Sequence, residues 1–187
     1  MTIAYSIFGE GLETHSKCAL LGSDPTGPQM LSFWRNMCIS NVDRNPDNNH
    51  FGGSCIEIVN NVFYNGQSEW GEVYAQFEGG TPINFTENLY KAGPSTQDET
   101  FAIRAKPAAS ISKPQIYQTG NKAIAPEGKT IEIVAPDTEQ FIVAEPPCAP
   151  SVPAIGSADQ AYKEVRTKAG AFPRDAVDQR FIKEMAD

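Results

Sequence analysis

The stretch NVDRNPDNN at 41–49 places one arginine, Arg44, among turn-forming residues and two acids, Asp43 and Asp47. Asn, Asp and Pro favour tight, non-helical backbone, so the stretch is predicted to be a loop. A guanidinium held on a loop can bind the carboxylate of an acidic ligand. It can also form an ion pair with Asp43 or Asp47, which is the commoner role of a loop arginine. Arg44 is therefore the first candidate for chemistry, with two roles to weigh.

The bulk composition fits one globular domain. The chain has 187 residues, of which 40% are hydrophobic and 10% aromatic, so it can bury a core and is not a disordered acidic tail. Its 15 basic and 23 acidic residues give a net charge of −8. This balance argues against nucleic acid or an anionic membrane as partner, but it leaves room for an anionic ligand in a local basic cleft.

Other signals in the chain exclude further classes. No apolar run is long enough to span a bilayer, and the N-terminal MTIAYSIFGEGLETHSK lacks the pattern of a signal peptide. The four cysteines have irregular spacings and no CxxC, and with only two histidines a zinc site is not expected. We expect buried cysteines with at most one disulfide; the three possible pairings stay open.

Four short β-rich segments recur in the first half of the chain. They are IAYSIFG (3–9), LSFWRNMCISN (31–41), IEIVNNVFYNG (56–66) and INFTENLYKAG (83–93). The segments are too short and too β-branched for helical repeats. Repeats of this length with β-type alternation predict a solenoid whose coils stack.

A polar residue holds the same place in each segment. Aligned before the second apolar pair, these residues are Ser6, Asn36, Asn61 and Asn88, with spacings of 30, 25 and 27 residues. In stacked coils, equivalent residues lie about 4.8 Å apart. We therefore predict that the three asparagines form an internal ladder, in which each amide bonds the next. The predicted fold is all-β: a parallel β-helix of about four coils over 1–93.

The second half differs in composition. Prolines punctuate 94–153, which we interpret as an irregular strand and loop tail packing on the β-helix. Strand-like pieces occur at 100–105, 114–121, 129–135 and 139–145. The segment 154–187 is predicted to hold short helices. The first has Ser157 as its N-cap and ends at Gly170, and the second begins at Pro173.

Five motifs, in order along nearly the whole chain, resemble pectate lyases of polysaccharide lyase family 1. They are HSKCALLG, NMCISNVDRNP, IVNNVFYNG, NLYKAGPST and AGAFPRDAVDQR, and the likeness is to the branch with an RNPR loop. The resemblance implies a right-handed parallel β-helix with a cleft along one side. It also implies secretion, calcium as cofactor and an acidic polysaccharide, polygalacturonate, as substrate.

The resemblance implies β-elimination, in which a base removes the C5 proton of a galacturonate unit and the glycosidic bond at C4 breaks. The family's base is an arginine, and crowding by other cations and calcium lowers the pKa of such a group. Arg44 holds the place of this base. Lys17 resembles the lysine that binds a substrate carboxylate; the alternative is a solvated surface lysine. His15 is a further candidate to line the cleft; the alternative is a hydrogen-bonded loop histidine.

Two departures from the family pattern concern this site. The second arginine of the RNPR loop is Asp47 here, and the alternative place five residues after Arg44 is Asn49. An acid there favours the protonated guanidinium and repels a uronate. The family's calcium-binding carboxylates also have no counterpart that we can match in this chain, so no metal ligand is assigned.

The remaining departure concerns the N-terminal end. Family members have several more coils before the HSK segment, and we interpret this chain as the later part of the usual fold, with a remnant active-site cleft. A partner chain would then supply the missing coils. Two functions stay open: a pectate lyase active only with those coils, or a non-catalytic β-helix module that binds acidic polysaccharide or forms part of a larger assembly such as a virion spike.

Overall fold

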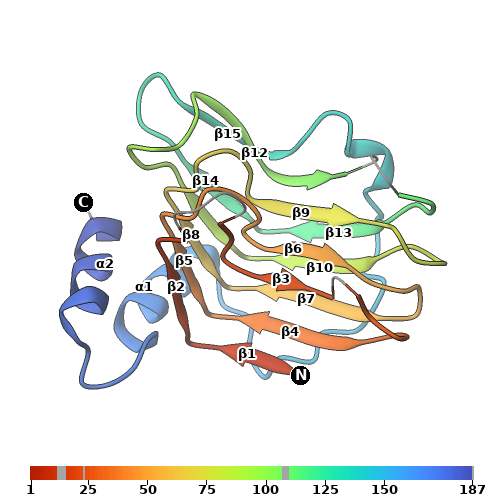
Figure 1. Cartoon of the computed structure of the whole chain (residues 1–187), viewed down its shortest axis with the longest axis horizontal. Helices are drawn as coiled ribbons and strands as arrows, with labels where there is room; N and C mark the ends of the chain where they lie inside the picture. Colours follow the sequence, from red (N-terminus) through yellow and green to blue (C-terminus); the bar gives the residue numbers. More distant parts are fainter. Residues whose placement is uncertain (12–15, 23, 107–109, 187) are drawn as a thin grey trace.

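The protein is a stack of β-coils, seen in a computed structural model that describes residues 1–11, 16–22, 24–106 and 110–186 (Figure 1). Each coil contributes one strand to each of three parallel sheets. The first sheet contains β1 (Thr2–Ala4), β4 (Met30–Trp34), β7 (Cys55–Val59), β10 (Pro82–Thr86) and β13 (Gln115–Thr119). The second contains β2 (Ile7–Gly9), β5 (Met37–Ile39), β8 (Val62–Tyr64), β11 (Leu89–Lys91) and β14 (Lys122–Ile124). The third contains β3 (Leu20–Leu21), β6 (Asp47–Asn49), β9 (Gly71–Tyr74), β12 (Glu99–Ala105) and β15 (Thr130–Val134). The predicted parallel β-helix is confirmed.

The asparagine ladder forms at the corner between the first and second sheets, as predicted. Asn36 Nδ2 donates to Asn61 Oδ1 (3.2 Å), and Asn61 Nδ2 donates to Asn88 Oδ1 (3.1 Å). Asn121 adds a rung that the sequence analysis missed, because Asn88 Nδ2 donates to its Oδ1 (3.0 Å). The ladder satisfies amides that are otherwise cut off from water.

The chain turns this corner through one residue of left-handed backbone before each ladder position. These residues are Tyr5, Arg35, Asn60, Glu87 and Gly120, with φ between 51° and 64°. Their side chains differ. What the corner requires is therefore the left-handed backbone, followed by the ladder residue.

The core lies inside the coils and is made of stacked apolar rungs. Phe33, Ile58 and Phe85 pair in register along the first sheet and are fully buried. Phe63 and Tyr90 stack on the second sheet with ring centroids 4.9 Å apart. Burial of these rungs is the main stabilising contribution to the fold, because the effect scales with the apolar area removed from water.

The β-helix continues past residue 93, where the sequence analysis ended it. β12 to β15 pair with the earlier strands, and the sheets extend to Val134. Proline punctuation misled the prediction because Pro114 and Pro126 lie between strands, while the prolines from Pro136 onward follow the last strand. The predicted strand piece at 139–145 instead contains a short 3-10 helix, η1 (Glu139–Phe141).

A strap formed by 143–156 crosses the outer face of the first sheet. A disulfide joins Cys148 to Cys55 on β7, and Asn84 Nδ2 donates to the carbonyl of Cys148 (3.0 Å). The Ser151 amide donates to the carboxylate of buried Glu57 (2.9 Å). The second disulfide joins Cys18 to Cys38, so the expectation of at most one disulfide was wrong.

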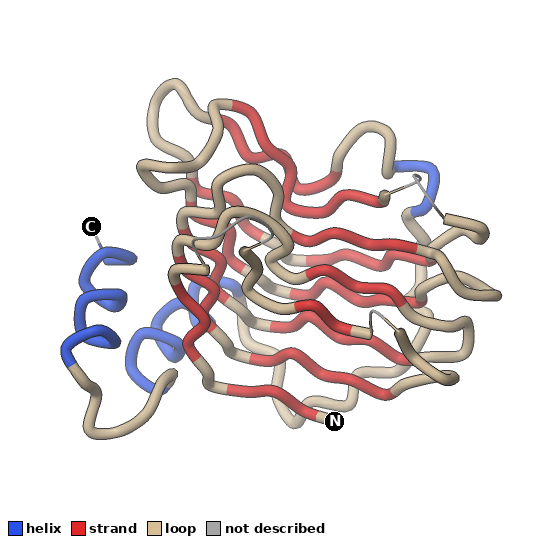
Figure 2. The backbone as a smooth tube through the Cα atoms, viewed as in Figure 1, coloured by secondary structure: helices blue, strands red, loops and turns tan. Residues whose placement is uncertain are grey.

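Two short helices cover the second sheet beside β2, β5 and β8 (Figures 1 and 2). Helix α1 (Ala158–Lys168) begins after Ser157, which forms a capping box with Gln160, so the predicted N-cap is confirmed. Helix α2 (Ala176–Ala186) begins three residues after Pro173. Asp175 explains the shift, because its Oδ1 accepts from the amides of Val177 and Asp178, both at 2.9 Å.

Candidate functional site

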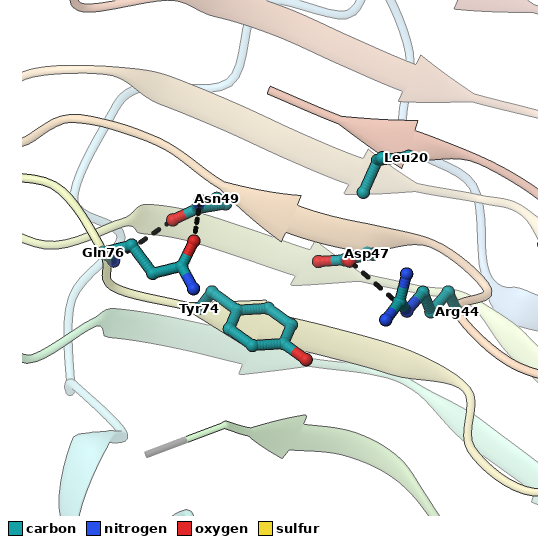
Figure 3. Close-up of a pocket in the computed structure, with 6 residues that line it drawn as sticks. All are labelled: Leu20, Arg44, Asp47, Asn49, Tyr74 and Gln76. Atoms are coloured by element: carbon teal, nitrogen blue, oxygen red, sulfur yellow. Dashed lines mark hydrogen bonds and ion pairs between the residues drawn. The ribbon is translucent and has the colours of Figure 1, made fainter. Parts of the chain in front are cut away.

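Arg44 lies at the mouth of a cavity on the outer side of the third sheet. It follows β5, has left-handed backbone with φ of 54°, and its side chain is 23% exposed. The cavity measures about 240 Å³ and is lined by Leu20, Arg44, Asp47, Asn49, Tyr74 and Gln76 (Figure 3). Arg44 thus lines a cavity and does not point into the core, so its side chain can contact a ligand there.

Parallel register brings the polar residues of this face together. Asp47 on β6 pairs with Glu72 on β9, which in turn pairs with Arg104 on β12. Because side chains alternate along a strand, Asn49 and Tyr74, two residues further along, face the same way. The intervening Asn48 and Val73 are fully buried.

The predicted loop at 41–49 therefore ends in a strand. Asp47–Asn49 pairs with β3 on one side and β9 on the other. Local preference for turns is overridden because stacking gives the backbone partners on both sides. This is a correction to the sequence analysis, and it matters because strand geometry fixes the direction of the Asp47 side chain.

Three carboxylates surround the guanidinium of Arg44. Its Nε lies 3.5 Å from Glu72 Oε2, 3.6 Å from Asp47 Oδ2 and 4.0 Å from Asp43 Oδ2. Figure 3 shows the Arg44 side chain beside Asp47 at one end of the cavity. The arrangement therefore holds Arg44 in ion pairs with acids of the protein itself, which is the commoner role of a loop arginine.

Glu72 also joins a second set of charges on β12 and the loop before β9. Lys106 Nζ contacts Glu72 Oε1 (3.1 Å) and the carboxylate of Glu69. Burial raises the pKa of Glu72 above its ordinary value, and a hydrogen bond with Glu69 raises it further. Lys106 opposes this rise but does not cancel it, so Glu72 holds a proton more tightly than an exposed glutamate does.

Asp47 is also a carboxylic acid with a raised pKa. Its side chain is only 6% exposed, and burial raises its pKa from 3.8 to about 6, against the opposing charges of Arg44, Lys17 and Lys106. Lys17 reaches this site because it forms a parallel bridge with Asp43 next to Arg44. The structure thus brings the predicted Arg44 and Lys17 together, while their roles stay predictions.

The far end of the cavity is polar and uncharged. Asn49 Nδ2 donates to Gln76 Oε1 (2.7 Å), and the Gln76 amide donates to Asn49 Oδ1 (3.1 Å). The Tyr74 ring lies between this pair and Arg44 (Figure 3). Amides and a phenol suit the hydroxyl groups of a sugar, because each can both donate and accept hydrogen bonds.

Of the two histidines, His50 alone lies in the described part of the chain, and it does not line this cavity. His15 lies outside the described residues. His50 is fully buried, and its Nδ1 hydrogen-bonds Gln29 Oε1 (2.7 Å). Burial lowers the pKa of His50 to about 4, so it stays neutral at ordinary pH, as expected of a hydrogen-bonded structural histidine.

Glu72, Tyr74 and Lys106 were not predicted from the sequence. The spacing from Asp47 to Glu72 is 25 residues, the same as from Asn36 to Asn61, so an alignment extended to this face would have paired them. Lys106 follows after a longer interval and was assigned to the tail. Its position could not be found without knowing that the coils continue past residue 93.

The residues described do not fit the calcium ion that the resemblance implies. Among residues 1–11, 16–22, 24–106 and 110–186, no group of three His, Cys, Asp or Glu side chains is arranged to hold a metal. The acids nearest the cavity already face Arg44 and Lys106. Calcium prefers several carboxylate and carbonyl oxygens, so a guanidinium among them opposes its binding.

We expect Asp47→Asn to stabilise the protein at neutral pH. Since the folded-state pKa of Asp47 is raised, the native state binds its proton more tightly than the unfolded state does, and stability falls as pH rises from about 4 to 6. The variant avoids this loss and should gain about 2 kcal/mol near pH 7.5 in urea unfolding, with no gain near pH 4.

Asp98→Asn is the control for this measurement, because the Asp98 side chain is 87% exposed. It should change the unfolding free energy by less than about 0.5 kcal/mol at either pH. Equal effects of the two variants would contradict the environment described for Asp47.

The fold defines the class: this is a parallel β-helix protein with a charged cavity on the outside of one sheet. It is similar to fungal proteins named probable pectate lyase C. The likeness is 28% identity over 190 residues for those of Aspergillus flavus and Aspergillus oryzae, covering 99% of this chain and 42% of each relative. For that of Neosartorya fischeri it is 34% over 101 residues, covering 54% of this chain and 22% of the relative.

These relatives confirm the resemblance to pectate lyases at modest identity. This chain spans less than half the length of the relatives it matches. No family model matches it, and no solved structure matches it significantly. In the described part of the chain, neither α1 nor α2 has the length and apolarity of a membrane-crossing helix.

Proposed function

We propose that the protein is a pectate lyase-like protein that acts on polygalacturonate, with the uronate held at the Arg44 cavity. One observation carries the proposal: Arg44, at the place of the family's base, lines an open polar cavity in a chain that is similar to named pectate lyases over 99% of its length. A uronate carboxylate beside Arg44 and sugar hydroxyls beside Asn49, Tyr74 and Gln76 would suit the chemistry of this lining.

The proposed reaction is β-elimination. A base takes the C5 proton of a galacturonate unit, the electron pair forms the C4–C5 double bond, and the glycosidic oxygen leaves C4. Arg44 is the proposed catalytic residue, and Lys17, bridged to Asp43, is proposed to add positive charge near the uronate. Positive charge at the carboxylate stabilises the enolate that develops as the proton leaves. We assign no step to calcium.

A second candidate function is binding without catalysis. The three carboxylates within 4.0 Å of Arg44 Nε favour it, because they hold the guanidinium in ion pairs with the protein and leave it less free to reach the C5 proton. In this case the face would hold an acidic polysaccharide as a non-catalytic module.

The surroundings of the protein are also part of the proposal. Two disulfides, Cys18–Cys38 and Cys55–Cys148, support an oxidising compartment such as the extracellular space.

The test compares polygalacturonate with a neutral galactan of similar length, with and without added calcium. Release of the unsaturated product is followed by its ultraviolet absorbance, and binding by isothermal titration. The proposal expects product and binding with polygalacturonate only. Binding without product in every condition supports the second candidate, whereas equal binding of both polymers, or of neither, contradicts the assignment of polygalacturonate.

A further inference from the structure

Two acids and two cations form a connected set of ion pairs on the outer face of the third sheet. Asp47 and Glu72 pair in register across β6 and β9, and both reach Arg44 Nε at 3.6 and 3.5 Å. Glu72 Oε1 also contacts Lys106 Nζ at 3.1 Å. These two acids thus occupy the positions that a ligand carboxylate would take against the cations.

Both carboxylates are buried and incompletely satisfied. The side chains of Asp47 and Glu72 are 6% and 4% exposed. Among the described residues, Asp47 Oδ1 and Glu72 Oε2 have no hydrogen-bond partner, and Asp47 lines the cavity. Burying an ionised carboxylate without such partners costs free energy. Binding a proton, or a closer ion pair, lowers this cost.

We propose that Asp47 and Glu72 act as internal competitors of the ligand, so that an acidic sugar binds Arg44 when protons have neutralised them. This inference rests on the proposed function and adds regulation by pH to the same site. Neutral Asp47 and Glu72 release the positive charge of Arg44 and stop repelling the uronate. The face then changes from one that excludes an acidic polymer to one that accepts it.

The charge balance of the whole face supports this change. The titratable and charged groups that face the pair from the neighbouring elements are Lys17, Asp43, Arg44, Glu69, Tyr74, Arg104, Lys106 and Asp137. With Asp47 and Glu72 ionised, five acids oppose four cations. With both neutral, the four cations exceed the remaining three acids, and the face becomes net positive.

The relevant pH window follows from the two kinds of carboxyl group. Burial raises the pKa of Asp47 to about 6 and that of Glu72 to about 8, so Glu72 still holds its proton at the pH values where Asp47 loses its own. The carboxyl of a sugar in water stays ionised down to about pH 4. Between about pH 4 and 6, the ligand is therefore charged while Asp47 is largely neutral.

The test is isothermal titration of the whole protein with a galacturonate oligomer at constant ionic strength, from about pH 5 to about pH 7.5. If binding takes up one proton, affinity falls by up to tenfold per pH unit above about pH 6, so we expect a loss of about tenfold or more for the unmodified protein. Asp47→Asn should bind at pH 7.5 nearly as tightly as the unmodified protein at pH 5. Asp98→Asn is the control and should keep the full pH dependence.

The outcomes separate this inference from the proposed function. Binding that does not vary with pH, or that varies equally in the unmodified protein and in Asp47→Asn, overturns the competition and leaves uronate binding in place. An absence of binding at every pH, in both proteins, overturns the proposed function and the inference together. Because Asp47→Asn is expected to be more stable near neutral pH, misfolding would not account for a negative result.

Discussion

Arg44→Ala should reduce product release from polygalacturonate by at least about 100-fold, since a general base contributes roughly 10²- to 10⁴-fold to a rate. The variant removes the guanidinium that lines the cavity and leaves Asp43, Asp47 and Glu72 facing it without their cation. A uronate would then meet these acids with Lys17 as the remaining proposed cation beside it. Both turnover and binding are expected to suffer, and steady-state kinetics followed by the absorbance of the unsaturated product measures each.

Arg44→Lys separates the two roles of the arginine. Lysine keeps a positive charge but cannot reproduce the geometry of the guanidinium. If Arg44 only attracts the uronate, the variant should keep much of kcat with a raised KM. If Arg44 takes the C5 proton, kcat should fall even where binding is retained.

Arg166→Ala is the matched control, because Arg166 lies on α1 and packs over the Tyr162 ring, on the second-sheet side of the molecule. It should keep the rate of the unmodified protein. A full rate in Arg44→Ala would remove Arg44 from the reaction altogether.

The fold could be predicted because its signal is repeated. Asn36, Asn61 and Asn88 hold the same position in successive coils. A few such matches along the sequence are enough to predict how the coils stack. The three sheets follow from stacking coils of the same kind. The short strands β3 and β6 carry no such repeated signal, since Asp47–Asn49 has the composition of a turn and becomes a strand only through its partners on both sides.

The site could be predicted only in part, for a related reason. Arg44 and Lys17 were found because each sits in a recognisable motif. Glu72 and Lys106 have no motif, and the contacts of Glu72 with Arg44 and with Lys106 depend on loop lengths that vary from coil to coil. The pairing of the cysteines likewise depends on how the strap 143–156 returns to β7, which spacing alone does not state.

The same stacking explains why buried charge is tolerated outside the third sheet. Neighbouring strands lie about 4.8 Å apart, so an acid on one strand and a cation on a nearby one can always be in reach. Asp47 on β6, Glu72 on β9 and Lys106, directly after β12, use this spacing. The stacked coils position these side chains, and the polar ladder within the corner contributes to the stability of the coils.

Asn61→Ala should therefore destabilise the whole protein by roughly 3–5 kcal/mol, since each buried polar group left without a partner costs about 1–3 kcal/mol. Asn61 is fully buried in the middle of the ladder. Its Oδ1 accepts from the Asn36 amide (2.9 Å) and Asn36 Nδ2, and its Nδ2 donates to the Phe33 carbonyl (2.8 Å) and Asn88 Oδ1. Urea unfolding followed by tryptophan fluorescence measures the loss, and the melting temperature should fall by roughly 10 °C.

Asn121→Ala is the matched control at the last rung. Asn121 makes equivalent bonds to Asn88 and to the Phe85 carbonyl, but it is only partly buried, so water can replace its amide. Its loss should cost about 1 kcal/mol. If the two variants cost the same, the ladder is no more than a set of independent turn bonds, and the continuity of buried amides through the coils does not hold the scaffold together.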